Sequence, residues 1–271
     1  MSLIEIIGYF GALLVGLVMG LTGSGGSVLS VPILAYLFGY DEKTATAYSL
    51  FIVGTIALFG SSRVLREGKV SRNAVIYFGI PSIIGVVIVR RILLPLIPEI
   101  IFQIGDFEFH RRMLVFGLFA TLMLVSAYSM LNKPKLKLSH FRRKTPAPPV
   151  LSIAGFLLGI FVGLIGAGGG FLMVPALMII ARMRIKTAVG TSMIIVCLNC
   201  LVGFFLGDFF NMEMEWGFLF SFVAISAIGI FIGGFLSNKI NSRALKTGFG
   251  YFILLIAVFV FMMEFLFNKV A

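Results

Sequence analysis

Long apolar stretches separated by short polar segments dominate the pattern along the chain. A helix needs roughly 20 apolar residues to cross a hydrocarbon core about 30 Å thick. The pattern predicts eight spans, near residues 3–22, 44–61, 74–93, 113–132, 150–165, 187–206, 216–236 and 248–267. Two shorter apolar pieces, near 28–39 and 171–182, are too short to cross comfortably. We therefore expect an all-α polytopic membrane protein.

A glycine-rich sequence occurs twice. Residues 16–34 recur 143 residues later as residues 159–177, with ten of 19 positions identical. The match continues without a gap to Ser49, which aligns with Ser192. A whole structural unit was therefore duplicated, and paired glycine-interrupted segments in two halves of a membrane protein are a pointer to a transport site.

Composition supports this class of protein. The 271 residues are 59% hydrophobic and 12% charged, whereas soluble domains are about 45–50% apolar and about 25% charged. The net charge of +11 is typical of a protein that binds nucleic acid, but the basic residues stand in short loops beside apolar spans. There they orient the protein by the positive-inside bias, so the expected partner is the lipid bilayer and not a nucleic acid.

The halves are joined by a basic, proline-containing linker. We predict a first repeat at 1–132, a linker at 133–149 and a second repeat at 150–271. The linker carries six basic and no acidic residues, which places it in the cytoplasm. The first span has no basic leader or cleavage site of a signal peptide, so we expect it to be part of the fold.

Loop charges predict that the two halves have opposite orientations. The segment after the third helical piece of the first half is basic, and its counterpart in the second half is acidic. These residues are Arg63, Arg66, Lys69 and Arg72 with Glu67 in the first half, and Asp208, Glu213 and Glu215 in the second. Five helical elements per half then give an inverted repeat with both termini outside. A re-entrant pair formed by each short helix and its predecessor keeps the same parity, and the sequence leaves both arrangements open.

One outer segment disagrees with this assignment. Four arginines surround its acidic residues, and we treat the segment as interfacial and as weak evidence. The arginines are Arg90, Arg91, Arg111 and Arg112, and the acidic residues are Glu99, Asp106 and Glu108.

The glycine-rich breaks are the candidate binding site. Unpaired backbone groups cost several kcal/mol each in lipid, so a broken helix must face protein or a water-filled cavity. Glycine lets a ligand approach the main chain, and a helix start favours an anion. Two such starts meeting near the midplane would form an anion pocket without a formal positive charge. The alternative is that the glycines only permit close helix packing, which we favour for Gly16, Gly20, Gly159 and Gly163. The candidate pocket residues are Gly23, Ser24, Gly25, Gly26, Ser27, Gly166, Ala167, Gly168, Gly169 and Gly170.

Hydroxyl and amide side chains in the following helices extend this candidate site. Ser49, Thr191 and Ser192 could line the same cavity or bond to carbonyls within their own helix. Asn199 stands deep in an apolar span, where a buried amide requires several partners.

Several chemistries have no residues to support them. The two histidines, His110 and His140, stand in loops, and no metalloprotease or ATP-binding motif is present. Cys197 and Cys200 form CxxC without a second ligand pair, which favours buried packing. We therefore predict no enzyme activity, cofactor or metal. Carboxylates are missing from the span centres, which disfavours proton coupling through a buried carboxylate.

The duplicated motif G-x-x-G-x-G-G-[GS]-x-x-x-V-P, followed by K-x-A-x-[GA]-x-S, resembles the TauE/SafE family of sulfite-exporter-type permeases. The resemblance covers nearly the whole chain and implies a prokaryotic cytoplasmic-membrane permease for small sulfur-containing anions such as sulfite or sulfonates. The motif is kept at Gly20, Gly23, Gly25, Gly26 and Pro32, and at Gly163, Gly166, Gly168, Gly169, Gly170 and Pro175. The run Gly190-Thr191-Ser192 reads Ala47-Tyr48-Ser49 in the first half, so the two sides of the pocket are unequal.

The leading hypothesis is a secondary transporter that moves a small oxyanion by rocking one repeat against the other. The alternatives are an intramembrane enzyme of sulfur metabolism and a non-transporting membrane partner. The sequence leaves open which anion is carried, the direction of flux, any coupling ion and whether the chain forms a homo-oligomer.

Overall fold

The computed structural model describes residues 3–23, 26–68, 70–104, 107–131, 147–237, 239–240 and 242–267. Within these residues, eight helical segments are long and apolar enough to cross a membrane, and two apolar helices are shorter. The prediction of an all-α polytopic membrane protein is confirmed. Large side chains such as Phe10, Tyr128 and Phe235 are more than half exposed, as expected of a surface that faces lipid.

The first half contains five helical elements. A π-helical segment continues the second element, and two such segments interrupt the fourth. The elements are α1 (Leu3–Thr22); α2 (Ser27–Pro32) with η1 (Ile33–Leu37); α3 (Glu42–Arg66); α4 (Arg72–Ala74), η2 (Val75–Gly79), α5 (Ile80–Ile88), η3 (Val89–Leu93) and α6 (Leu94–Leu96); and α7 (Arg111–Leu131).

The second half repeats this order. Its third and fifth elements end in π-helical segments. The elements are α8 (Pro148–Ile165); α9 (Gly170–Ile179); α10 (Ile185–Gly203) with η4 (Phe204–Asp208); α11 (Trp216–Ser237); and α12 (Ser242–Met262) with η5 (Met263–Phe267). The predicted count of five helical elements in each half therefore matches the described part of the chain.

A β-hairpin stands where the sequence was assigned to an interfacial segment. Strands β1 (Ile100–Ile104) and β2 (Phe107–His110) pair antiparallel. The sequence from Phe102 to His110 alternates apolar and polar residues around Gly105 and Asp106, a pattern typical of a hairpin. This signal was present in the sequence and our prediction did not use it.

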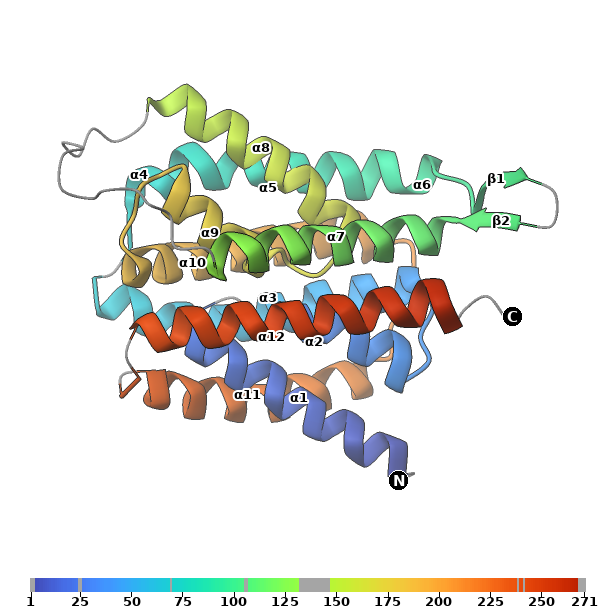
Figure 1. Cartoon of the computed structure of the whole chain (residues 1–271), viewed down its shortest axis with the longest axis horizontal. Helices are drawn as coiled ribbons and strands as arrows, with labels where there is room; N and C mark the ends of the chain where they lie inside the picture. Colours follow the sequence, from blue (N-terminus) through green and yellow to red (C-terminus); the bar gives the residue numbers. More distant parts are fainter. Residues whose placement is uncertain are drawn as a thin grey trace.

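The helices run along the long axis of the molecule (Figure 1). Helix α1 begins, and η5 ends, at the end of the bundle from which the hairpin projects. Helix α7 ends, and α8 begins, at the opposite end. The linker predicted at 133–149 falls almost entirely outside the described residues. The start of α1 and the end of η5 therefore share one end of the bundle.

Helix α1 packs closely on α11, and α8 packs closely on the η2–α5 segment. A β-carbon on Gly16 would lie 1.8 Å from the carbonyl oxygen of Ser226, and one on Gly159 would lie 2.1 Å from that of Ser82. These glycines therefore permit close helix packing, the alternative that we favoured for them.

The contacts of the two halves correspond residue by residue. A β-carbon on Gly229 would meet Leu13 and Leu17, and a β-carbon on Gly85 would meet Phe156 and Ile160. Leu13 and Leu17 precede Phe156 and Ile160 by 143 positions, which is the separation of the sequence repeat. Paired contacts of this kind are what two repeats related by a pseudo-two-fold axis produce, and they support the proposed inverted repeat.

Candidate functional site

The first glycine-rich break joins α1 to α2. Gly23 is buried and adopts a φ of +87°, and its amide donates to the carbonyl of Met19. Ser24 and Gly25, two of the predicted pocket residues, lie outside the described residues. Gly26 precedes α2 and lies against α1, since a β-carbon there would be 2.1 Å from the carbonyl oxygen of Val15. Glycine is thus required both by the backbone conformation at position 23 and by close packing at position 26.

The hydroxyls after this break form a buried group. The Oγ atoms of Ser30 and Ser49 lie 2.6 Å apart, and Ser30 also donates to the carbonyl of Ser27. All three residues are fully buried. The structure thus brings Ser27 and Ser49 together through Ser30.

The second break joins α8 to α9 through three glycines with a left-handed backbone. Gly166, Gly168 and Gly169 have φ values of +68°, +67° and +61°. Ala167 between them is fully buried, and Gly170 begins α9. A left-handed backbone is strained for other residue types, which explains why glycine recurs at these positions.

The second break contacts both repeats. A β-carbon on Gly168 would lie 2.7 Å from Sγ of Cys200 on α10 and 2.8 Å from Val53 on α3. Helices α3 and α10 pack on one another, and α2 contacts α9. The short helices therefore meet, and Gly168 lies beside the two helices that join the halves, with apolar side chains over it.

Three predicted polar residues on α10 have other partners. Thr191 Oγ1 accepts from the amide of Ser71 at 3.0 Å, and Ser192 Oγ donates to the carbonyl of Val189. Asn199 Nδ2 donates to Ser82 Oγ at 2.7 Å, while its Oδ1 has no partner among the described residues. Ser192 lies beside the first break, since a β-carbon on Gly23 would be 2.9 Å from the carbonyl oxygen of Val189 to which Ser192 donates. The described hydrogen bonds of Thr191 and Asn199 run instead to Ser71 and Ser82.

A cavity of about 130 Å³ lies beside the first break. Gly20 and Gly23 form one wall, and α3, α10 and α11 form the others. Its charged lining residues are Arg63, Glu67 and Lys186. Of the described residues predicted for the pocket, Gly23 lines this cavity, and cationic side chains stand in its wall although the prediction required none.

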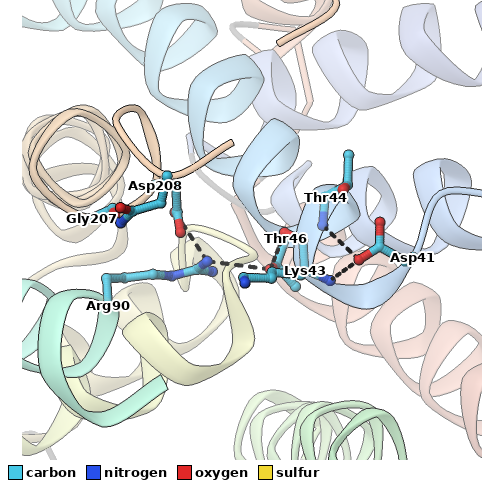
Figure 2. A network of polar contacts seen from close by, with 8 residues as sticks. Asp41, Lys43, Thr44, Thr46, Arg90, Gly207 and Asp208 are labelled. Atoms are coloured by element: carbon cyan, nitrogen blue, oxygen red, sulfur yellow. Dashed lines mark hydrogen bonds and ion pairs between the residues drawn. The ribbon is translucent and has the colours of Figure 1, made fainter. Parts of the chain in front are cut away.

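The corresponding place beside the second break is filled by Arg90. Figure 2 shows its side chain reaching from η3 to Asp208 and to the start of α3, where Lys43 and Thr46 lie. Nη1 lies 3.1 Å from Asp208 Oδ2 and 3.3 Å from Thr46 Oγ1. The side chain of Arg90 is completely buried, and that of Asp208 is 6% exposed.

Arg90 and Asp208 were missed as site residues. Arg90 was counted as an interfacial arginine, and Asp208 was assigned to an outer loop. Asp208 instead ends the π-helical segment η4 and is buried. Only the structure reveals the relation of Arg90 to the cavity: Gly85 and Gly229 make equivalent contacts with α8 and α1, which makes Arg90 the counterpart of Gly234 in the cavity wall.

Two of the three other arginines of the disagreeing segment, Arg111 and Arg112, also have carboxylate partners. Arg111 pairs with Glu42, and Arg112 pairs with Glu264 at 3.2 Å. Because these carboxylates compensate the positive charge, the arginines say little about membrane orientation. The segment therefore does not argue against the outer placement predicted for it.

Tyr40 lies outside the spans, at the end of the bundle where α3 begins. Tyr40 donates its hydroxyl hydrogen to Glu215 Oε2 at 3.0 Å and packs edge-on against Tyr48. Burial, together with the neighbouring Glu215, raises the pKa of Tyr40, which therefore stays protonated as a donor. Tyr48 in turn accepts from the amide of Glu215. The two tyrosines join the start of α3 to the segment before α11.

No group of three or more histidine, cysteine or acidic residues that could hold a metal occurs in the described ranges. Cys197 and Cys200 are buried free thiols.

Comparison with known proteins identifies relatives over most of the chain. Residues 9–260 match the family model described as Sulfite exporter TauE/SafE. A probable membrane transporter protein of Xylella fastidiosa is 26% identical over 266 residues, covering 96% of this chain and 95% of its own length. A probable membrane transporter protein of Methanocaldococcus jannaschii is 35% identical over 117 residues, covering 41% of this chain and 43% of its own. The probable membrane transporter protein YunE of Bacillus subtilis is 26% identical, covering 85% and 86%. No solved structure matches.

Proposed function

Since the chain belongs to the sulfite exporter TauE/SafE family and is a membrane transporter, we propose that it carries a small sulfur-containing anion, such as sulfite or an organosulfonate, across the cytoplasmic membrane. Transport proceeds down the gradient of the anion or under the membrane potential. The anion binds near the midplane, beside the two glycine-rich breaks.

The cavity beside the first break is the observation that carries this proposal. It lies between elements of both repeats, and its charged residues are two cations and one anion, Arg63, Lys186 and Glu67. Arg63 and Glu67 also pair with one another at 3.0 Å. Lys186 therefore supplies an attractive field for an anion at the entrance, and the small volume suits a cargo of few atoms.

The breaks themselves support an anion as cargo. Four of their glycines, Gly23, Gly166, Gly168 and Gly169, hold a left-handed backbone, and such turns bring main-chain amides together. Helices α2 and α9, which follow the breaks, direct the positive ends of their dipoles toward them. Movement of one repeat against the other would then expose the breaks alternately to the two sides.

Orientation completes the proposal. The linker at 133–149 is cytoplasmic, and both termini are outside. The paired arginines of the hairpin end support this, because their charge is compensated by Glu42 and Glu264.

The test is flux of labelled sulfite through the purified protein in proteoliposomes, with a potassium gradient and valinomycin to set the membrane potential. We expect uptake that depends on the protein and responds to the potential. Equal uptake by protein-free vesicles would rule out sulfite, and the same assay with thiosulfate and taurine would then identify the cargo class.

A further inference from the structure

Arg90 has hydrogen-bond donors without acceptors in a buried place. Its Nη1 serves both Asp208 and Thr46, while Nε and Nη2 have no partner in the described part of the chain. A guanidinium carries five N–H donors, and buried donors are normally paired. Two unpaired nitrogens on a completely buried cation mark a place where an acceptor is missing.

The surrounding main chain leaves room for this arginine. A β-carbon on Gly166 would lie 2.0 Å from Nη2, and one on Gly207 would lie 2.6 Å from Cβ of Arg90. Glycine at both positions is therefore required by the arginine. Gly166 is also the first residue of the second break, so Nη2 lies directly against the turn that we propose to bind the anion.

The pseudo-two-fold relation of the repeats relates Arg90 to the cavity at the first break. Gly85 and Gly229 make equivalent contacts with α8 and α1. Five residues after each of them, Arg90 therefore corresponds to Gly234, which lines the open cavity. In the same way Lys43, near Arg90 in Figure 2, precedes Lys186 of the cavity by 143 positions. The place that is open beside Gly23 is thus occupied, beside Gly166, by the side chain of Arg90.

We propose that Arg90 binds the transported anion through Nε and Nη2, with Asp208 as the internal counterion that holds Arg90 when no anion is present. The proposal rests on the proposed function and adds a charged residue to its site. The ligand is a small oxyanion with two accessible oxygens, because the planar guanidinium fork matches such a group with two parallel hydrogen bonds. When the space beside Gly166 opens, the anion takes the unpaired nitrogens.

A purely structural ion pair is the competing explanation. Both explanations predict that loss of one partner destabilises the protein, since an uncompensated buried charge remains. They differ for the double variant R90Q/D208N, in which the charge is balanced again. A structural pair predicts that flux returns with stability, whereas an anion site predicts that stability returns without flux.

The experiment compares wild type, R90Q, R90K, D208N and R90Q/D208N, reconstituted for sulfite flux and melted in detergent. We expect R90Q/D208N to melt near wild type but to lose sulfite flux at least about tenfold, since a hydrogen bond to a charged group is worth that much. R90K should keep part of the flux, because its ammonium still donates. R91Q is the matched control, since Arg91 is the exposed neighbour in η3, and it should transport as wild type does. Recovery of both flux and stability in R90Q/D208N would overturn the proposal.

A second measurement separates this proposal from the choice of sulfite. If wild type carries no sulfite, or if the double variant does not fold, D208N is melted in sodium formate and in sodium gluconate at equal ionic strength. An anion site at Arg90 predicts a higher melting temperature in formate, because this small anion offers two oxygens to the guanidinium in place of the missing carboxylate. Equal melting in both salts, or no folded D208N in either, would refute the site whatever the cargo is.

Discussion

Gly16 of α1 and Ser226 of α11 stand 210 positions apart in the sequence, yet a β-carbon on Gly16 would lie 1.8 Å from the carbonyl oxygen of Ser226. The hydroxyl of Ser226 also donates to the carbonyl of Ala12 at 2.8 Å. The first helix of one repeat is thus fixed to the fourth helix of the other by backbone contact.

This contact predicts a large effect of small substitutions. In G229A the added methyl would lie 2.3 Å from the carbonyl oxygen of Leu13, and helices that cannot approach must separate. We expect the free energy of unfolding to fall by about 1–3 kcal/mol, measured by thermal melting in detergent. G217A in the same helix has no neighbour within 4 Å and should melt as wild type does. Equal melting of both variants would show that α1 and α11 do not pack as described.

The second break predicts a loss of transport. In G168L the side chain would enter the space of Cys200 and Val53, and the residue would be forced into a left-handed conformation. We expect sulfite flux to fall to the level of protein-free vesicles while the protein still reaches the membrane. G39L separates crowding from strain, because Gly39 also has a positive φ but no neighbour within 4 Å. Normal flux in G168L would remove the second break from the site.

The cavity predicts an electrostatic effect at its mouth. K186E reverses the charge beside the first break, and we expect sulfite affinity from that side to fall about two- to fivefold at low salt. The difference should shrink as ionic strength rises, which initial rates at several salt concentrations would measure. Arg184 precedes Lys186 by two positions, is exposed and does not line the cavity. R184E should therefore change the rate less than K186E, and an equal change would argue against a role of the cavity.

The proposed orientation predicts the location of reporters. A phosphatase fused after Ala271 should be active outside the cell, whereas one inserted within the 133–149 linker should be inactive. Green fluorescent protein at the same two positions should give the opposite pattern. Activity of both phosphatase fusions would contradict the placement of the linker in the cytoplasm.

The buried ion pair of Arg90 and Asp208 predicts that loss of either charge destabilises the protein. R90Q and D208N alone should each lower the free energy of unfolding by about 3–5 kcal/mol, because each leaves one buried charge without its partner. Loss of either Arg63 or Glu67 should cost less, since the side chains of that pair are 38% and 32% exposed. Melting curves of the single variants test this order, which would be wrong if R90Q melted as wild type does.

The lengths of the apolar stretches predicted most of the helices. The span expected at 3–22 is helix α1 (Leu3–Thr22), and the short pieces expected at 28–39 and 171–182 correspond to α2 with η1 and to α9. Helix α3 ends at Arg66, five residues beyond the expected end at 61. The prediction counted only apolar residues, whereas the helix continues into the polar residues that follow them. The π-helical segments had no sequence signal that we could use.

The candidate site was predicted less completely. The glycine motif indicated the two breaks correctly, because a left-handed backbone selects glycine. Thr191 and Asn199 were predicted from polarity alone, and their contacts with Ser71 and Ser82 depend on tertiary packing. Arg90 was missed because loop charges were used to orient the chain, and charge counting does not show which residue pairs with Asp208.

The correspondence of Arg90 with Gly234 has a consequence for evolution. Were the protein a homodimer of a single unduplicated repeat, every substitution would appear at both entrances, so an arginine that filled one would fill the other. Fusion of two copies in one gene removes that constraint. Selection can then act on each face of the carrier separately, and a preferred direction of movement becomes heritable without any new helix.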